Sequence, residues 1–221
     1  MVQVRKGRMP ESARGAPDRR IARSRRALVD AAERLVGERG VDAVSIDDLI
    51  GSADVAKGTF YNHFEDKAAL ARAVAAAVRA DADSLVARHS EGIDDPAQRC
   101  ARALFVYAGF AAAAPIRARA LMHIETMTVG PDAAINHGLR ADVEAGLVSG
   151  AFHSLDRSAA MLYVSGVAGA LIASALIGRD WRRVGEAMVA MCLTGLGMPP
   201  SEASRLAREA ARDIGGPGAF G

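Results

Sequence analysis

Apolar residues recur along most of the chain at the spacing of helix faces. The first such face repeats at i, i+3, i+4 and i+7, and it comprises Leu28, Ala31, Ala32, Leu35 and Val36. Gly40 follows as a typical helix stop. Few segments alternate with the period of two that strands show. The pattern therefore predicts a protein built of helices.

Two short helices and a longer one are predicted after this first helix. Ser45 can cap the second helix, because Asp48 follows three residues later as in a capping box. Residues 52–55 (SADV) indicate a tight turn, and the third helix begins within VAKGTFYNHF, residues 55–64. Asp66 offers a cap for the fourth, longer helix. Two short helices around a tight turn, braced by another helix, are typical of a helix-turn-helix.

The third helix divides its residues between two faces. Phe60 and Phe64 are four residues apart, so we expect both to pack inward. The outward positions are Lys57, Gly58, Thr59, Tyr61, Asn62 and His63. Glycine permits close approach of a phosphate backbone, and hydroxyl and imidazole groups donate to phosphate oxygens. The alternative is a small helical subdomain whose polar residues beside the two phenylalanines are incidental.

The charge distribution adds a basic N-terminal segment. Residues 1–26 carry nine Lys and Arg against two acidic residues, a net +7, which leaves −5 for the rest of a +2 chain. Gly, Pro and Ser interrupt this segment, so we predict a disordered basic arm over residues 1–18. Basic arms often touch nucleic acid, whereas the alternative is a solvated tail that aids solubility.

Catalytic and metal chemistry find little support in the sequence. Cys100 and Cys192 lie far apart, without a Cys-x-x-Cys motif or a Cys/His cluster, and the N-terminus shows no secretory signal. We therefore expect two reduced cytoplasmic thiols. No nucleophile–base pairing stands out, so we expect neither an enzyme nor a bound metal or cofactor.

Residues 24–72 resemble the DNA-binding domain of the tetracycline-repressor (TetR) family of bacterial regulators. The resemblance lies in the ERG helix ending, the V-S-I-x-x-L second helix and the string KGTFYNHFEDKAAL. It implies an all-α fold with an N-terminal three-helix helix-turn-helix domain and a C-terminal helical ligand-binding and dimerisation domain. The expected organisation is the arm at 1–18, the DNA-binding domain at 19–67 and the effector-binding and dimerisation domain at 68–215.

The resemblance also implies roles for individual residues. Lys57, Gly58 and Asn62 would face base edges, since lysine donates to guanine and asparagine pairs with adenine. The implied phosphate contacts are Ser45, Thr59, Tyr61, His63 and Lys67. Asp54 departs from the usual turn glycine, and Ala56 from the usual capping residue.

The predicted DNA-binding domain is acidic. Residues 27–67 carry four Lys and Arg against nine Asp and Glu, and Asp47 and Asp48 both lie on the second helix. A polyanion is bound poorly by such a surface alone. We therefore hypothesise that the basic segment supplies phosphate or minor-groove contacts, from Arg19, Arg20, Arg23, Arg25 and Arg26.

The C-terminal part offers candidates for an effector pocket and a dimer interface. Candidate pocket walls, each of which is also compatible with plain core, are Phe105, Tyr107, Phe110, Met122, His123, Met127 and Met161. Residues 159–178 lack charge and are long enough to span a membrane, but they are rich in Ala and Gly. Their small-residue stripe better matches a dimer interface of the family, with candidates Gly166, Ala170, Ser174, Trp181 and Met188.

The sequence thus predicts a cytoplasmic, homodimeric transcriptional regulator without membrane attachment. The expected partners are a palindromic double-stranded DNA operator and a small apolar or amphipathic effector that releases it, as for a repressor. One alternative is a dimeric helical ligand- or partner-binding regulator whose DNA binding has weakened. The other is a membrane-tethered helical protein built around residues 159–178.

Overall fold

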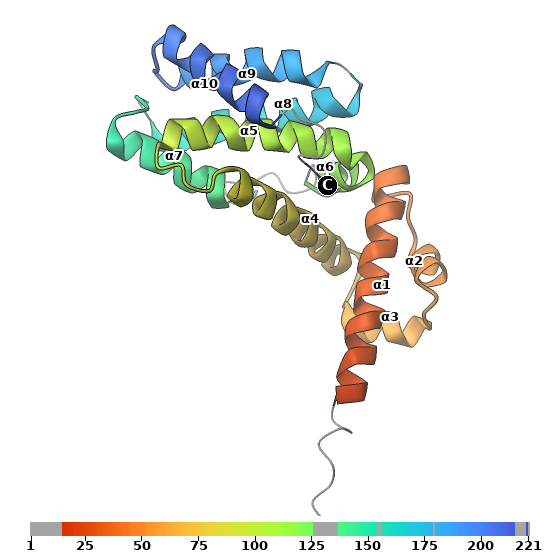
Figure 1. The fold of residues 1–221 in the computed structure, drawn as a ribbon. Coiled ribbons are helices and arrows are strands. Elements are labelled where there is room, and N and C mark those ends of the chain that lie inside the picture. Colours follow the sequence, from red (N-terminus) through yellow and green to blue (C-terminus); the bar gives the residue numbers. More distant parts are fainter. Residues whose placement is uncertain (1–14, 126–136, 154–155, 179, 215–219, 221) are drawn as a thin grey trace, which may run out of the picture.

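The computed structural model describes residues 15–125, 137–153, 156–178, 180–214 and 220, and every regular element in these ranges is an α-helix. The all-helical expectation is confirmed for this part of the chain. Figure 1 shows a small N-terminal domain joined by one oblique helix to a larger C-terminal bundle. The N-terminal helices are α1 (Gly15–Arg39), α2 (Ile46–Ala53) and α3 (Lys57–His63), and the joining helix is α4 (Lys67–His89). The bundle contains α5 (Pro96–Ala113), α6 (Pro115–Glu125), α7 (His137–Ser149), α8 (Arg157–Leu176), α9 (Trp181–Gly195) and α10 (Pro200–Ile214).

Local sequence signals mark both the starts and the ends of the helices. Gly40 stops α1 with a φ of +84°, a backbone conformation that glycine adopts without steric cost. Asp66 caps α4 by accepting from the Ala69 amide at 2.6 Å. Asp95 caps α5 in the same way, through the Ala97 amide at 3.1 Å. The orphan amides at these helix starts are therefore satisfied within the chain.

The first helix begins earlier than the sequence indicated. Residues 15–18, which we assigned to a disordered arm, belong to α1. Residues 1–14 of that arm lie outside the described residues. The sequence-based boundary at 67/68 falls within the first turn of α4, so a continuous helix crosses it.

The helix α4 belongs to both domains. At one end it packs against α1, and farther along it packs against α5, α6 and α7. Its apolar residues are buried along the whole length, from Leu70 and Val74 to Val78 and Leu85. A rotation or shift of α4 in the bundle would therefore be transmitted to the N-terminal domain.

A second connection between the domains is the close packing of α6 on α1. Gly37 of α1 is buried against the backbone of Ile116. A Cβ atom at Gly37 would overlap the Ile116 carbonyl and lie 2.8 Å from Cγ2 of that residue. The two helices therefore approach this closely only because position 37 has no side chain.

The helix α5 is the centre of the bundle, since residues 103–111 are all buried. Gly109 on this helix carries the aromatic ring of Phe220, which leaves no room for a Cβ atom. The Phe220 ring also lies 6.4 Å from Trp181 and 6.0 Å from His89. The absence of a side chain at position 109 thus gives the Phe220 ring its place against α5.

Candidate nucleic-acid interface

The turn between α2 and α3 keeps its shape despite the two departures in its sequence. Ser45 and Asp48 form the predicted capping box, with the Asp48 amide donating to Ser45 Oγ at 3.1 Å and the Ser45 amide to Asp48 Oδ2 at 3.0 Å. The Ser45 hydroxyl also donates to Asp48 Oδ2 at 2.5 Å, and this bond, together with that from the Ser45 amide, lowers the pKa of Asp48. Asp54 adopts the left-handed conformation at φ 51°, as expected for the residue that replaces a turn glycine. Ala56 provides no side-chain cap to α3.

Two phenylalanines fix α3 to the N-terminal domain. Phe60 is fully buried and Phe64 is 5% exposed, as the sequence predicted. They belong to one apolar core with Leu28 and Leu49, and the Arg25 guanidinium lies 5.2 Å from the centre of the Phe64 ring. Burial of both rings leaves the opposite face of α3 directed outward.

The outward face of α3 is open. Lys57, Gly58, Tyr61 and Asn62 are exposed, and Tyr61 retains 52% of its accessible surface. No atom lies within 4 Å of the position that a Cβ of Gly58 would occupy. Thr59 is half-buried at the edge of this face. Shape and exposure therefore suit an approaching polymer backbone, although contact of these residues with DNA stays a prediction.

Both predicted lysine contacts have partners inside the protein. Lys57 Nζ lies 3.1 Å from Asp47 Oδ1, so the lysine of α3 is paired with an acid of α2. Lys67 Nζ donates to the carbonyls of Val41 and Val44 at 2.9 and 3.0 Å, which closes the loop between α1 and α2. This internal role leaves one ammonium N–H of Lys67 for a phosphate.

His63 is also bonded within the protein, and its bond connects α3 to α1. His63 is half-buried, and its Nε2 lies 2.7 Å from Ser24 Oγ. Sequence reasoning placed His63 on the outer face and missed Ser24, because residues 39 positions apart carry no local signal of contact. The bond ties the basic part of α1 to the last turn of α3.

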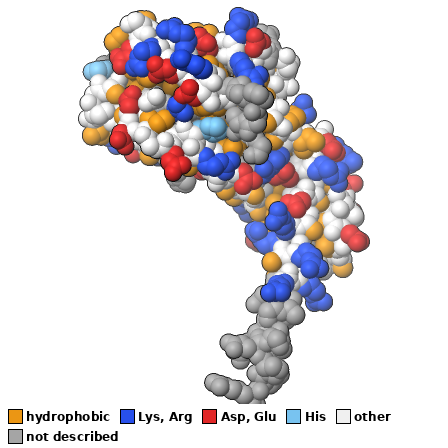
Figure 2. Space-filling model, in the orientation of Figure 1, with side chains coloured by type: hydrophobic (Ala, Val, Ile, Leu, Met, Phe, Trp, Pro, Cys, Tyr) orange, Lys and Arg blue, Asp and Glu red, His pale blue; other side chains and the backbone are white. Residues whose placement is uncertain are grey.

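The N-terminal part of α1 presents the arginines that we expected in the basic segment. Figure 2 shows Lys and Arg side chains gathering over this end of the N-terminal domain. The exposed residues there are Arg19, Arg20, Arg23, Arg25 and Arg26. Because they stand on a helix that is bonded to α3, their positions relative to the outward face of α3 are fixed.

Arg117 of α6 joins the two domains electrostatically. Its Nε lies 3.0 Å from Glu33 Oε1 on α1, and its Nη2 lies 2.7 Å from Asp81 Oδ2 on α4. Its guanidinium also lies 5.8 Å from the centre of the Phe110 ring on α5. One side chain therefore contacts the N-terminal domain, the joining helix and the centre of the bundle, and sequence reasoning did not identify it.

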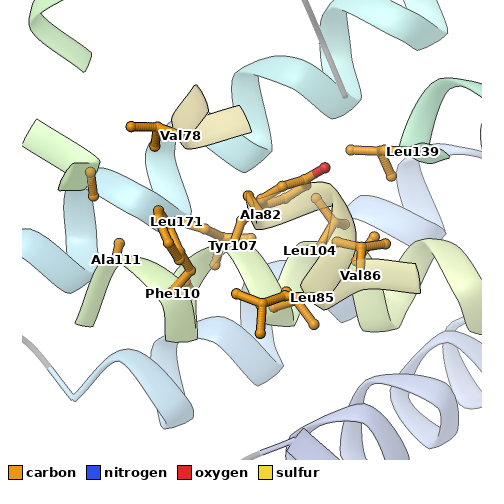
Figure 3. Close-up of a cluster of buried hydrophobic side chains, with 14 of the residues drawn as sticks. Val78, Ala82, Leu85, Val86, Leu104, Tyr107, Phe110, Ala111, Leu139 and Leu171 are labelled. Atoms are coloured by element: carbon orange, nitrogen blue, oxygen red, sulfur yellow. The ribbon is translucent and has the colours of Figure 1, made fainter. Parts of the chain in front are cut away.

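The candidate effector residues fall in different parts of the bundle. Tyr107 and Phe110 lie in the apolar cluster drawn in Figure 3, with Leu85 of α4 and Leu171 of α8. Phe105, on another side of α5, packs against Trp181 with ring centres 5.9 Å apart.

The other candidate wall residues differ in burial and surroundings, and Met161 packs against the core cluster that contains Tyr107 and Phe110. His123 is exposed, and it approaches Gly40 at the end of α1. Met122 and Met161 are half-buried, and Met127 lies outside the described residues. The six described candidates thus range from buried to exposed, and a shared pocket for them stays a prediction.

The candidate dimer residues also separate into two groups. Gly166 and Ala170 lie on an exposed stripe of α8 that continues through Leu162 and Ile177, each of which is 67% exposed. Ser174 and Trp181 turn inward, since the Ser174 hydroxyl is buried and Trp181 packs on Phe105. Met188 is half-buried on α9, beside Met191 with 69% exposure.

Among the described residues, α8 is the one unbroken helix that is long and apolar enough to cross a membrane, with a mean hydropathy of 1.8. Only 28% of its most apolar window is buried within the chain. An exposed apolar face of this kind indicates either a protein partner or a lipid environment.

The thiols and acids of the described residues show no reactive arrangement. Cys100 and Cys192 are free and buried. Burial raises the pKa of Cys192 to about 12 and raises that of Cys100 well above its usual value, so neither forms a thiolate at neutral pH. Within the described ranges, no three His, Cys, Asp or Glu side chains come together as a metal site would require.

Comparison with known proteins identifies the N-terminal domain. The model of the family described as bacterial regulatory proteins, tetR family, matches residues 28–74. The transposon Tn10 TetC protein of Escherichia coli is 52% identical over 40 residues, which make up 18% of this chain and 20% of that protein. The chain thus matches about a fifth of the length of this curated relative.

Solved structures extend the similarity to most of the chain. The structure of RolR with its ligand resorcinol has a TM-score of 0.60 at 25% identity and covers 86% of this chain and 95% of its own. TylP, a tetR regulator of Streptomyces fradiae, has a TM-score of 0.61 at 23% identity and covers 89% and 96%. The latter likeness shows the fold alone.

Proposed function

Because residues 28–74 match the model of bacterial regulatory proteins, tetR family, we propose that this chain is a DNA-binding transcriptional regulator, a cytoplasmic repressor released from a palindromic operator by a small molecule. The observation that carries the proposal is the open face of α3. Lys57, Gly58, Tyr61 and Asn62 are exposed there, while Phe60 and Phe64 anchor the helix from behind. Such a face fits the major groove, where lysine and asparagine read base edges.

The arginines of α1 supply the positive charge that the helix-turn-helix lacks. Neutralising phosphates with Lys or Arg releases counterions, so affinity falls with salt in proportion to the number of contacts. Removal of residues 1–18 should weaken binding to DNA and flatten its salt dependence, because Arg5, Lys6, Arg8 and Arg14 are lost while α1 from Arg19 onward remains. A salt slope equal to that of the full chain would contradict this role.

Dimerisation places two copies of α3 on the operator, and the exposed stripe of α8 is the surface we propose for it. Leu162, Gly166, Ala170 and Ile177 share one side of the helix, and small residues at its centre permit close packing. A Gly166→Glu variant would bury a charge in the contact. We expect this variant to be monomeric in analytical ultracentrifugation, whereas Gly51→Glu, at an exposed glycine of α2 with open space around it, should remain dimeric.

We propose that the effector binds beside Tyr107 and Phe110, where α4, α5 and α8 meet (Figure 3). Resorcinol bound to RolR supports a small, partly polar ring as the kind of ligand. A ligand that displaces the Phe110 ring also removes the contact of Arg117 with it, and Arg117 holds Glu33 and Asp81. Release of DNA would then follow from a shift of α1 against α4.

The test of the proposed function is a gel shift with the DNA that flanks the gene for this chain, at low salt. We expect a specific complex that unlabelled random duplex does not compete away. The matched variant is Asn62→Ala, which removes an exposed amide from α3 without touching the core. Absence of a specific shift for the native chain would contradict the proposal and favour the ligand- or partner-binding regulator, which the neutralised charge of Lys57 also suggests.

A further inference from the structure

Lys57 of α3 and Asp47 of α2 form an ion pair on the outward face of the helix-turn-helix. Lys57 Nζ donates to Asp47 Oδ1 at 3.1 Å, and the side chains remain 59% and 75% exposed. Lys57 is the only Lys or Arg in the sequence from 46 to 63. The single Lys or Arg of α2 and α3 is thus already paired with a carboxylate.

The other two acids of this segment have different tasks. Asp48 accepts from the amide and hydroxyl of Ser45, at 3.0 and 2.5 Å, and completes the cap of α2. Asp54 closes the end of α2 in the left-handed conformation. Asp47 instead reaches across to the lysine of α3, so local helix geometry does not explain its position.

The spacing of this ion pair matches the edge of a G·C base pair in the major groove. Guanine O6 accepts and cytosine N4 donates, and since these two atoms are bonded to each other they lie about 2.9–3.0 Å apart. Lys57 Nζ and Asp47 Oδ1 present the opposite pattern, a donor and an acceptor 3.1 Å apart. Exposed ion pairs add little stability, so both groups are free to form bonds with DNA.

We propose, building on the DNA-binding function argued above, that Asp47 and Lys57 together read one G·C pair in each half-site of the operator. Lys57 donates to guanine O6, and Asp47 accepts from the cytosine N4 amino group. Asp47 also disfavours binding to other sequences. Where no cytosine amino group lies beside it, the carboxylate is repelled by base acceptors and phosphates.

The arrangement favours G·C over A·T. An A·T pair also presents a donor next to an acceptor, but thymine offers only one acceptor, O4, beside its methyl group. Guanine offers N7 in addition to O6, and lysine prefers this doubled acceptor. We therefore expect one fixed G·C pair at symmetric positions in the two half-sites.

The experiment is selection of bound sequences from a library of random duplexes. The full-length native chain is compared with Asp47→Asn, Lys57→Gln and the variant with both changes. Asp42→Asn is the control, because it removes one exposed acid from the same domain outside the α2–α3 segment. Thermal unfolding, followed by circular dichroism, confirms that each variant is folded.

We expect the native chain and Asp42→Asn to select the same palindrome with the fixed G·C pair. Asp47→Asn and Lys57→Gln should each lose the preference at that pair and keep it elsewhere. On single duplexes, changing the pair to A·T should weaken native binding roughly tenfold or more. The same change should alter binding of the double variant less than about twofold.

Two results would overturn the inference while the proposed function stands. In the first, Asp47→Asn keeps the native preference at every position and gains affinity uniformly, as Asp42→Asn does, so Asp47 contributes charge alone. In the second, the two single variants lose preference at different base pairs, so the residues do not act together. A native chain that selects no sequence would instead contradict the proposed function itself.

Discussion

Ser24 of α1 and His63 of α3 share a hydrogen bond of 2.7 Å between Oγ and Nε2, and this bond joins the basic helix to the recognition helix. Ser24 Oγ also lies 3.0–3.1 Å from the carbonyls of Ile21 and Arg20. A serine hydroxyl has one proton, so donation to a carbonyl leaves Ser24 to accept from His63. The arginines around Ser24 therefore have a defined place beside α3.

Replacing Ser24 by alanine should loosen this junction. The lost hydrogen bond corresponds to about 0.5–1.5 kcal/mol in the free energy of unfolding. We also expect weaker DNA binding with a smaller salt slope, because the arginines of α1 lose their alignment. Urea unfolding and fluorescence anisotropy at several salt concentrations measure the two effects. His63→Ala should add little to Ser24→Ala in the double variant, and fully additive losses would show that the two residues act separately.

Gly58→Ala should separate stability from DNA binding. The free protein has open space at this position, so alanine is accommodated in α3 and should stabilise the domain by about 0.5–1 kcal/mol. Binding to the selected operator should nevertheless fall, because the methyl group occupies the surface that approaches DNA. Gly51→Ala, another helical glycine with open space, is the control and should gain stability without a comparable loss. Unchanged operator affinity of Gly58→Ala would show that DNA does not approach Gly58.

Gly37→Ala should damage the contact between α1 and α6. The new methyl group would overlap the backbone of Ile116, which cannot move aside as a side chain could. We expect a loss of about 1–3 kcal/mol in urea unfolding, in the range of overpacked cores. Native stability in this variant would mean that α1 and α6 separate easily, and the proposed route through Arg117 would then lack a firm support.

The two cysteines should resist thiol reagents while the protein is folded. With a pKa of about 12, Cys192 is a thiolate in about one molecule in ten thousand at pH 8. Native protein should therefore react with Ellman's reagent only as fast as it unfolds, and urea should expose both thiols. Because the folded pKa lies above the unfolded value of about 9, the contribution of Cys192 to stability is present below pH 9 and is lost as pH rises toward 12. Rapid reaction of folded protein would contradict the burial.

Local features were accessible from the sequence because each depends on residues close together in the chain. The capping box of Ser45 and Asp48, the left-handed Asp54 and the inward Phe60 all follow from spacing and backbone preference. Contacts between distant residues were not accessible. Nothing in helical periodicity reveals that Arg117 meets Glu33, or that one side of α5 faces Trp181 and the other Leu171. The exposed face of α3 was therefore largely predictable, whereas the neighbours of the effector candidates on α5 were not.

The seating of Phe220 on Gly109 links two positions that are 111 residues apart. Any side chain at position 109 would occupy the space of the Phe220 ring. A substitution at one of the two positions therefore requires a substitution at the other. Among relatives of this chain, we expect an aromatic residue near the C-terminus to accompany glycine at the position of Gly109, and to be absent where alanine or a larger residue stands there. The residue at position 220 is therefore subject to the same evolutionary constraint as the buried helix α5 on which it packs.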